Sequence, residues 1–407
     1  MDHPFRLRAF AGYHRTLALV VVAAGFSACG GSGSDSPSSP VPANPGTIPA
    51  DFAKQTIDLS TYPDAVCNDG SPAIFYIQRG VGAAAAANAN KTVIGLRGGG
   101  FCLSDADCSA RPSDLKSSIG YPSEGSAEGL LSSDASNDTF RSWNRVSVPY
   151  CSSDFFSGDV GATGSAINFR FRGAKIIAAV VQTLNRQYGI GKAGDTVILA
   201  GGSAGAVGAF INANRVRAAL PGASVLALID AGIYPDVAPL LPGTPPWTSV
   251  RDLGPIGLSY WNGQVDADCA AANPGNPGNC YLFEHAQPTL RTPFFVIQNA
   301  RDAVGIINVG LLQSSDNLDN LALTSWVRAT YLPAMGNILR PLGLSSGQGV
   351  FAVCLDPDVH TLSSDTTLWT TPMAEVGGVA LKDTVASWVA GGGTATRAVT
   401  SASCSFP

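Results

Sequence analysis

Positive charge is sparse in this sequence and nowhere clustered. Of its 407 residues 14% are charged, the formal net charge is −5, and no long run of lysine and arginine occurs. Proteins that bind nucleic acid set clustered lysine and arginine against the phosphates. Nucleic acid is therefore not expected as a partner.

Histidine is also scarce, and the cysteines are not spaced for metal. Beyond the N-terminal segment only His285 and His360 occur, and there is no Cys-x-x-Cys pair. Structural zinc sites are built from closely spaced cysteines and histidines. A metal site of this kind is therefore not expected.

The apolar run at the N-terminus is too short to span a bilayer as a helix. Leu17–Phe26 falls well below the roughly 20 residues that a transmembrane helix needs. It follows three arginines and ends in small residues before Cys29, an order that resembles a bacterial lipoprotein signal. We expect residues 1–28 to be the signal peptide and Cys29 to carry the lipid. The alternative is an ordinary secretory signal, with Cys29 removed or unpaired.

The segment after the signal is typical of a flexible tether. Residues 29–51 are rich in glycine, serine and proline, which have nothing to bury. Gly30, rather than an aspartate, favours the outer membrane in a host with two membranes. Without Cys29 eight of the nine cysteines remain, an even number suited to an oxidising compartment. The protein is thus expected to be exported and lipid-anchored, in the periplasm or at the cell surface.

Residues 52–407 show no second linker and no domain-scale repeat, so we expect one catalytic domain. Short apolar runs alternate with helical stretches, which favours an α/β fold with a mostly parallel sheet and helices on both faces. Residues 234–291, rich in proline and glycine, are interpreted as an insertion near the active site, either a pocket wall or lid or a plain surface excursion. Predicted strands are Ala73–Gln78, Thr92–Leu96, Arg145–Val148, Asp195–Leu199, Ser224–Ile229, Pro293–Gln298 and Gly349–Val353, and predicted helices are Gly173–Tyr188, Ala204–Ala218, Leu318–Leu332 and Lys382–Val389.

A candidate nucleophile lies between a strand and a helix. Gly201-x-Ser203-x-Gly205 follows an apolar strand and precedes a helix, the context that a nucleophile elbow requires. The alternative is a glycine-rich turn of a doubly wound sheet. A second match, at residues 343–347, precedes its strand and has no helix after it, so we interpret it as a loop.

An acyl-transfer serine needs donors for the oxyanion and a base. The strand that ends at Leu96 is followed by a glycine run, and the N–H groups of Gly99 or Gly100, with that of Ala204, are the candidate donors; the alternative is a tight turn. Cys102 and Cys108 are near enough in sequence to staple this loop. His360 follows the strand Gly349–Val353, the place of the catalytic histidine in this chain order, and is the candidate base.

The candidate acid is Asp302, with Asp230 as the alternative. Both follow strands whose carboxyl ends should lie at the same edge of the sheet. In this fold the acid usually follows the penultimate strand, which is the strand before Asp302 if Gly349–Val353 is the last. Asp230 is then structural and accepts backbone hydrogen bonds near the elbow.

Over residues 60–390 the chain resembles the pectin acetylesterase/Notum-type carboxylesterases. The run Val-Pro-Tyr-Cys-Ser-Ser-Asp-Phe-Phe-Ser-Gly-Asp (148–159) is the most specific match. Further matching runs are Cys-Asn-Asp-Gly-Ser-Pro-Ala (67–73), Leu-Arg-Gly-Gly-Gly-Phe-Cys (96–102), Phe-Arg-Gly-Ala (171–174) and Gly-Gly-Ser-Ala-Gly (201–205).

The resemblance implies an α/β-hydrolase fold, hydrolysis of carboxylic esters without a cofactor, and an extracellular or periplasmic setting. It also implies disulfides between Cys67 and Cys151 and between Cys102 and Cys108, and its acid lies in a segment like Asn299–Asp302. The chain departs from the family at four positions beside the expected pocket: Arg97 replaces a common acidic residue, Phe101 a tryptophan, Ala206 a glycine, and Thr361 the cysteine of the plant enzymes.

The sequence therefore predicts a serine carboxylesterase with the triad Ser203, His360 and Asp302. The expected substrate is a small acyl ester, such as an acetyl group on a polysaccharide. Two alternatives remain: a lipase or polyester depolymerase, and a catalytically silent surface-binding protein on the same fold.

Overall fold

The structure is a computed structural model that describes residues 47–161, 168–243, 247–312 and 320–400. The predicted signal peptide, the lipid site Cys29 and most of the predicted tether lie outside the described residues. None of the helices that are described is both long and apolar enough to cross a membrane.

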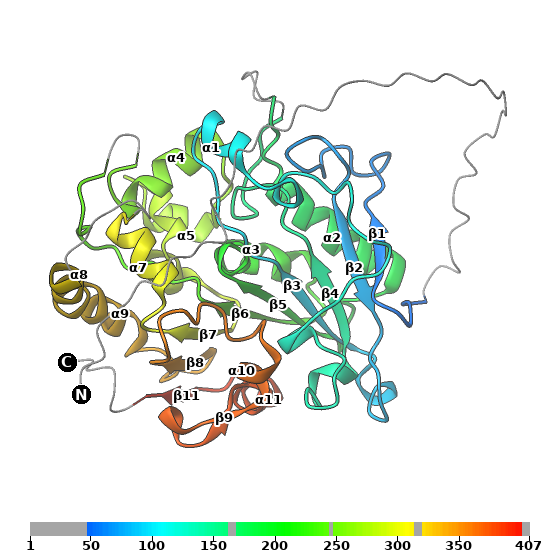
Figure 1. The fold of residues 1–407 in the computed structure, drawn as a ribbon. Coiled ribbons are helices and arrows are strands. Elements are labelled where there is room, and N and C mark those ends of the chain that lie inside the picture. Colours follow the sequence, from blue (N-terminus) through cyan, green and yellow to red (C-terminus); the bar gives the residue numbers. More distant parts are fainter. Residues whose placement is uncertain (1–46, 162–167, 244–246, 313–319, 401–407) are drawn as a thin grey trace, which may run out of the picture.

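A nine-stranded sheet forms the centre of the molecule, in the order β1-β2-β4-β3-β5-β6-β7-β8-β11 (Figure 1). β1 pairs with β2 and β2 with β4 in antiparallel fashion, whereas the neighbours from β4 to β11 are all parallel. The strands are β1 Ala53–Thr56, β2 Ile74–Gln78, β3 Lys91–Leu96, β4 Asn144–Val148, β5 Thr196–Gly202, β6 Ser224–Asp230, β7 Phe294–Asn299, β8 Gln348–Val353 and β11 Thr396–Val399, with a separate two-stranded ribbon of β9 Pro372–Met373 and β10 Val379–Ala380.

The predicted strands are all found, with small differences at their ends, but two strands of the large sheet and both strands of the separate ribbon were missed. β1 and β11 are short edge strands that mix charged and polar residues with few apolar ones. Edge strands face solvent and therefore carry no apolar run. The assumption that Gly349–Val353 is the last strand is wrong, because β11 follows it and pairs with β8.

The helices follow the predictions closely in three of four places. α2 Gly173–Tyr188 has the predicted bounds, α3 differs from its prediction by one residue at one end, and α11 by one residue at each end. The first two residues of the predicted helix Leu318–Leu332 lie outside the described residues, and the helix continues beyond its predicted end, as α8 passes through a π-helical turn at Val327–Tyr331 into α9. The helices are α1 Asp105–Ala110, α2 Gly173–Tyr188, α3 Ala204–Ala219, α4 Leu253–Tyr260, α5 Ala267–Ala272, α6 Phe283–Ala286, α7 Ala303–Gly310, α8 Asn320–Trp326, α9 Leu332–Leu339, α10 Thr366–Thr370 and α11 Leu381–Ala390.

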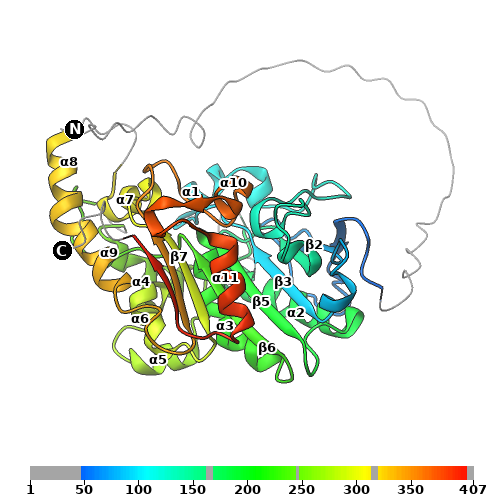
Figure 2. The ribbon, with the colours of Figure 1, turned by 90° about the horizontal axis from the view of Figure 1, so that it is seen from below.

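Helices cover both faces of the sheet (Figures 1 and 2). Side chains alternate along each strand, so that Val197 and Leu199 of β5 join one buried cluster while Ile198 joins another. The first cluster contains α2 and α3, and the second contains α10 and α11. Both faces of the parallel strands are therefore buried, which explains their nearly continuous apolar sequences.

The insertion at residues 234–291 is a packed part of the domain rather than a surface excursion. It contains α4, α5 and α6, and a disulfide joins Cys269 to Cys280. Trp261 and Tyr281 are fully buried. The indole of Trp261 donates to the carbonyl of Cys102 at 2.9 Å, so the insertion is tied to the glycine-rich loop after β3.

Candidate active site

Ser203 occupies the sharp turn between β5 and α3. Its backbone is strained, with φ 57° and ψ −123°, a conformation that is rare for residues other than glycine. The turn depends on glycine at two neighbouring positions. A Cβ would lie 2.0 Å from the carbonyl oxygen of Gly205 if placed on Gly201, and 2.2 Å from that of Leu96 if placed on Gly205. The Gly-x-Ser-x-Gly pattern thus lets strand and helix meet closely enough to present Ser203.

The glycine run after β3 lies directly against Ser203. A Cβ on Gly98 would lie 2.8 Å from the Cβ of Ser203. Gly99 and Gly100 have φ of 151° and 70°, values that turn the backbone in ways open mainly to glycine. Ala204 is the first residue of α3, and N–H groups in the first helical turn have no partner within the helix. Gly99 and Gly100 line the same cavity as Ser203, so the loop that carries two of the predicted oxyanion donors lies beside the nucleophile.

A short disulfide and the insertion support this loop. Cys102 and Cys108 are joined, as the family resemblance implies. The amide of Cys102 also donates to the carbonyl of Ser153 at 3.2 Å. Together with the bond from Trp261, these contacts hold the chain immediately after Gly99 and Gly100 from three directions.

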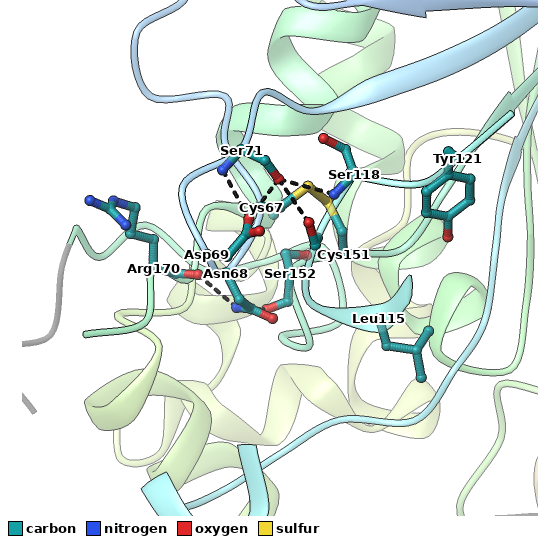
Figure 3. The surroundings of a disulfide bond; sticks show 12 residues. Cys67, Asn68, Asp69, Ser71, Leu115, Ser118, Tyr121, Cys151, Ser152 and Arg170 are labelled. Atoms are coloured by element: carbon teal, nitrogen blue, oxygen red, sulfur yellow. Dashed lines mark hydrogen bonds between the residues drawn. A yellow bond between two sulfur atoms is a disulfide. The ribbon is translucent and has the colours of Figure 1, made fainter. Parts of the chain in front are cut away.

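A second disulfide joins Cys67 to Cys151 (Figure 3), two residues before Ser153, whose carbonyl accepts from Cys102. The side-chain amide of Asn68 donates to the carbonyl of Ser152 at 2.9 Å and to that of Arg170 at 2.7 Å. Cys151 and Ser152 belong to the run of residues 148–159 that carries the most specific family motif. The motif is therefore structural at this end, because it supports the loop that surrounds the nucleophile.

His360 lies in the loop after β8 and is held by Asp302. The two are joined by a 2.8 Å hydrogen bond between the histidine Nδ1 and the carboxylate Oδ2. The other carboxylate oxygen of Asp302 accepts from the backbone N–H of Val304 at 2.9 Å, which caps α7. His360 Nε2 is buried and has no hydrogen-bond partner among the described residues. Since Nδ1 faces a carboxylate, it carries the proton, and Nε2 is left as the acceptor.

Asp230 is fully buried but contacts a different part of the histidine loop. Its Oδ2 accepts from the backbone N–H and from the hydroxyl of Ser363, both at 2.6 Å. Its carbonyl oxygen accepts from the N–H of Ser203 at 2.8 Å. Burial raises the pKa of Asp230 to about 6, against the lowering effect of the Ser363 bonds and of the charge on His360.

The electrostatics around His360 favour its charged form. Burial works against the imidazolium, but the hydrogen bond to Asp302 and the charges of Asp302 and Asp230 outweigh it. The pKa of His360 therefore lies above its usual value.

Ser203 and His360 open into one cavity of about 650 Å³ at the carboxyl ends of the central strands. Its walls are mixed in character. The polar lining includes Arg97, Arg111, Glu128, Tyr234 and Asn308, and the apolar lining includes Phe101, Leu130, Leu131, Val304 and Ile307.

The sequence predictions missed Tyr234. It is buried and lines the cavity together with Ser203. It follows β6 after a turn in which Ala231 adopts a positive φ of 56°. A tyrosine so soon after a buried parallel strand is the signal that was available, because such strands end at the active-site edge of the sheet.

Comparisons with known proteins bear on the family and on the fold. A family model described as pectinacetylesterase matches residues 49–407. Pectin acetylesterase 7 from Arabidopsis thaliana is 29% identical over 267 residues, 65% of this chain and 65% of that protein. Palmitoleoyl-protein carboxylesterase notum1' from Xenopus laevis is 30% identical over 325 residues, 73% of this chain and 60% of that protein. The match thus spans slightly less than two thirds of each of these curated relatives.

A solved structure is similar over nearly its whole length. The Wnt deacylase Notum from Drosophila has a TM-score of 0.74 with this chain at 24% identity, and the match covers 87% of this chain and 97% of that one. At this identity the likeness concerns the fold, and it confirms the predicted α/β-hydrolase architecture.

Proposed function

This chain belongs to the pectinacetylesterase family, as its motifs predicted, and on that premise we propose that it is a serine carboxylesterase. Ser203 is the nucleophile, His360 the general base and Asp302 the acid that orients it. The N–H groups of Ala204 and of Gly99 or Gly100 are the oxyanion donors.

One observation carries the assignment. The strained Ser203 and His360 line the same cavity, the Nε2 of His360 has no hydrogen-bond partner among the described residues, and its Nδ1 bonds to Asp302 at 2.8 Å. A serine, a base and a group that orients the base are the parts that acyl transfer requires.

The proposed reaction has two halves. His360 Nε2 takes the proton of the Ser203 hydroxyl as the oxygen attacks the ester carbonyl, and the oxyanion that forms is bound by the backbone N–H groups. The intermediate collapses, the proton passes to the leaving alcohol, and the acyl group remains on Ser203. Water then attacks the acyl-enzyme with His360 again as base, which releases the carboxylic acid and restores Ser203.

The cavity walls support a short acyl group on a polar substrate, such as an acetyl ester of a polysaccharide. The polar residues Tyr234, Asn308 and Arg111 are among those that line it. A long hydrocarbon chain laid over these groups would remove them from water without giving them hydrogen bonds, which is unfavourable. Hydroxyl-rich sugars would satisfy them.

The second candidate is a long-chain esterase, which includes the lipase and polyester-depolymerase alternative. The apolar side chains of Leu130, Leu131 and Ile307 favour it, as does the similarity to the palmitoleoyl-protein carboxylesterase from Xenopus laevis.

Hydrolysis of p-nitrophenyl esters from acetate to palmitate, together with release of acetate from acetylated pectin and xylan, tests the proposal. We expect kcat/KM to fall as the acyl chain lengthens and Ser203→Ala to abolish turnover. A maximum at long chains would favour the second candidate. Turnover that survives in Ser203→Ala would overturn the catalytic assignment. A wild-type protein with no activity on any ester would favour the remaining alternative, a catalytically silent binding protein on the same fold.

The proposal extends to the location of the protein. The disulfides Cys67–Cys151, Cys102–Cys108 and Cys269–Cys280 support export to an oxidising compartment. Anchoring through a lipid on Cys29 remains a prediction from the sequence. Mass spectrometry of the mature N-terminus tests it, and an unmodified N-terminus that begins after Cys29 would contradict it.

A further inference from the structure

Asn299, the last residue of β7, is fully buried and makes four side-chain hydrogen bonds. Its Nδ2 donates to the carbonyls of Asp356 at 3.0 Å and Val359 at 2.8 Å. Its Oδ1 accepts from the backbone N–H groups of Arg301 at 3.2 Å and Leu355 at 3.1 Å.

These partners admit only one orientation of the amide. Two carbonyl oxygens face one end of the Asn299 side chain and two N–H groups face the other. A reversed amide would oppose oxygen to oxygen and donor to donor, so the network itself assigns the two ends. The side chain is fully satisfied only when both neighbouring loops are in place.

The two loops joined in this way carry the acid and the histidine. Arg301 directly precedes Asp302, whereas Leu355, Asp356 and Val359 lie in the loop that leads to His360. Two backbone bonds run alongside: Asp302 N–H donates to the carbonyl of Asn299 at 3.1 Å, and Ala303 N–H donates to that of Pro357 at 2.9 Å. Asn299 thus lies at the base of both loops and belongs to neither.

We propose that Asn299 is a positioning residue for ester hydrolysis, holding the Asp302 turn and the His360 loop at the separation that their hydrogen bond requires. The inference rests on the proposed roles of Ser203, His360 and Asp302. Asn299 does not line the cavity and acts through the other two residues. Its loss removes the side-chain links between the two loops, and leaves the backbone bond from Ala303 to Pro357 and the His360–Asp302 bond itself to hold them together.

The test is Asn299→Ala in the full chain, assayed on p-nitrophenyl acetate. We expect kcat to fall by about 10²-fold, the loss typical of a misplacement of about 1 Å, while KM stays close to the wild-type value. If this variant does not fold, Asn299→Asp replaces it. That variant has nearly the same shape and keeps both accepted bonds but loses both donated ones, and we expect it to show the same loss in kcat.

A pH profile separates positioning from a general loss of stability. The charged groups that face His360 are Asp302, from the turn after β7, and Asp230, from the end of β6. If Asn299→Ala loosens the contact with Asp302, His360 loses the bond that raises its pKa, and the acid limb of kcat/KM moves to lower pH.

Asn212 is the matched control, because it is an equally buried asparagine on α3. It donates to the carbonyls of Phe156 and Gly208 and accepts from Arg215. We expect Asn212→Ala to lower the melting temperature and leave kcat and the pH profile of the folded enzyme unchanged.

The outcomes distinguish this inference from the proposed function. A folded Asn299→Ala or Asn299→Asp with normal kcat, beside an inactive Ser203→Ala, overturns the positioning role and leaves the esterase assignment intact. Equal effects of Asn299→Ala and Asn212→Ala on kcat and on the acid limb would also overturn it. An active Ser203→Ala overturns the proposed function itself.

Discussion

The two sides of the candidate site are held in different ways. On the oxyanion side, the loop with Gly99 and Gly100 is stapled by Cys102–Cys108 and packed on the loop that Cys67 and Cys151 tie down. On the histidine side, Cys354 at the start of the loop is disulfide-bonded as well, but the segment around His360 itself is held by hydrogen bonds to buried polar side chains, namely Asp302, Asp230 and Asn299. Asp230 binds the residues after His360, and Asn299 binds those before it.

The difference fits the separate roles of the oxyanion side and the histidine side in the proposed reaction. Backbone N–H donors do not change charge, so they need only a fixed position, which covalent links and tight glycine turns provide. A catalytic histidine gains and loses a proton in each half-reaction. Carboxylates close to it stabilise the charged form as well as holding the ring.

Among the variants that test the difference between the two sides, Asp302→Asn is expected to have the largest effect. The variant keeps the shape of the acid but loses the charge and reverses the preferred histidine tautomer. We expect kcat to fall on the order of 10⁴-fold, as in the serine-protease precedent, with a nearly unchanged melting temperature. Steady-state kinetics and thermal melting measure both.

Asp230→Asn, measured beside it, should lose much less activity, because Asp230 contacts Ser363 and not the histidine ring. An inactive Asp230→Asn together with a near-normal Asp302→Asn, both folded, would reverse the two assignments.

Removal of the disulfide between Cys67 and Cys151 should produce the largest loss of stability. Cys67 and Cys151 are 84 residues apart, and the chain-entropy model gives about 4.5 kcal/mol for a loop of this size. We expect Cys67→Ser/Cys151→Ser to lower the free energy of unfolding by that order, as measured by urea denaturation. A loss below about 1 kcal/mol would contradict the structural role assigned to this disulfide.

Removal of the disulfide between Cys102 and Cys108 should reduce turnover more than stability. Cys102 and Cys108 are six residues apart, for which the same model gives roughly 2 kcal/mol. We expect Cys102→Ser/Cys108→Ser to reduce kcat more than it raises KM, because oxyanion donors act on the transition state. Unchanged kcat in the folded variant would show that Ser153 and Trp261 hold the loop without the disulfide.

The smallest expected effect concerns pH. A protonated His360 cannot act as a base, so activity falls as the pH drops through its raised pKa. Asp230→Asn removes one of the charges that raise it and should move the acid limb of kcat/KM to lower pH, whereas Asp138→Asn, on the surface beside Lys382, should not. A wild-type rate that is flat from about pH 5 to 8 would contradict a histidine base.

Much of the fold was predictable because its central strands are buried on both faces. β3, β5, β6 and β7 appear in the sequence as apolar runs. The helical pattern of residues 173–188 predicted the bounds of α2 correctly. β1 and β11 were not predictable in this way, because edge strands bury little and carry mixed residues. α7 was missed as well, since apart from Asn308 it consists of apolar and glycine residues that give no clear amphipathic pattern.

The sequence by itself determined the chemistry that depends on local order. The elbow around Ser203 and the glycine run at 98–100 are local, because a strand, a turn and a helix that follow one another need only the right small residues at the right spacing. Only the tertiary structure decided which aspartate meets His360 and which buried side chains hold the two together. Asp230 and Asp302 both end or follow parallel strands, so sequence position brings both to the same edge of the sheet. The choice between them depends on the path of the loop after β8, which Asn299 and Asp230 set through hydrogen bonds to residues more than 50 positions away.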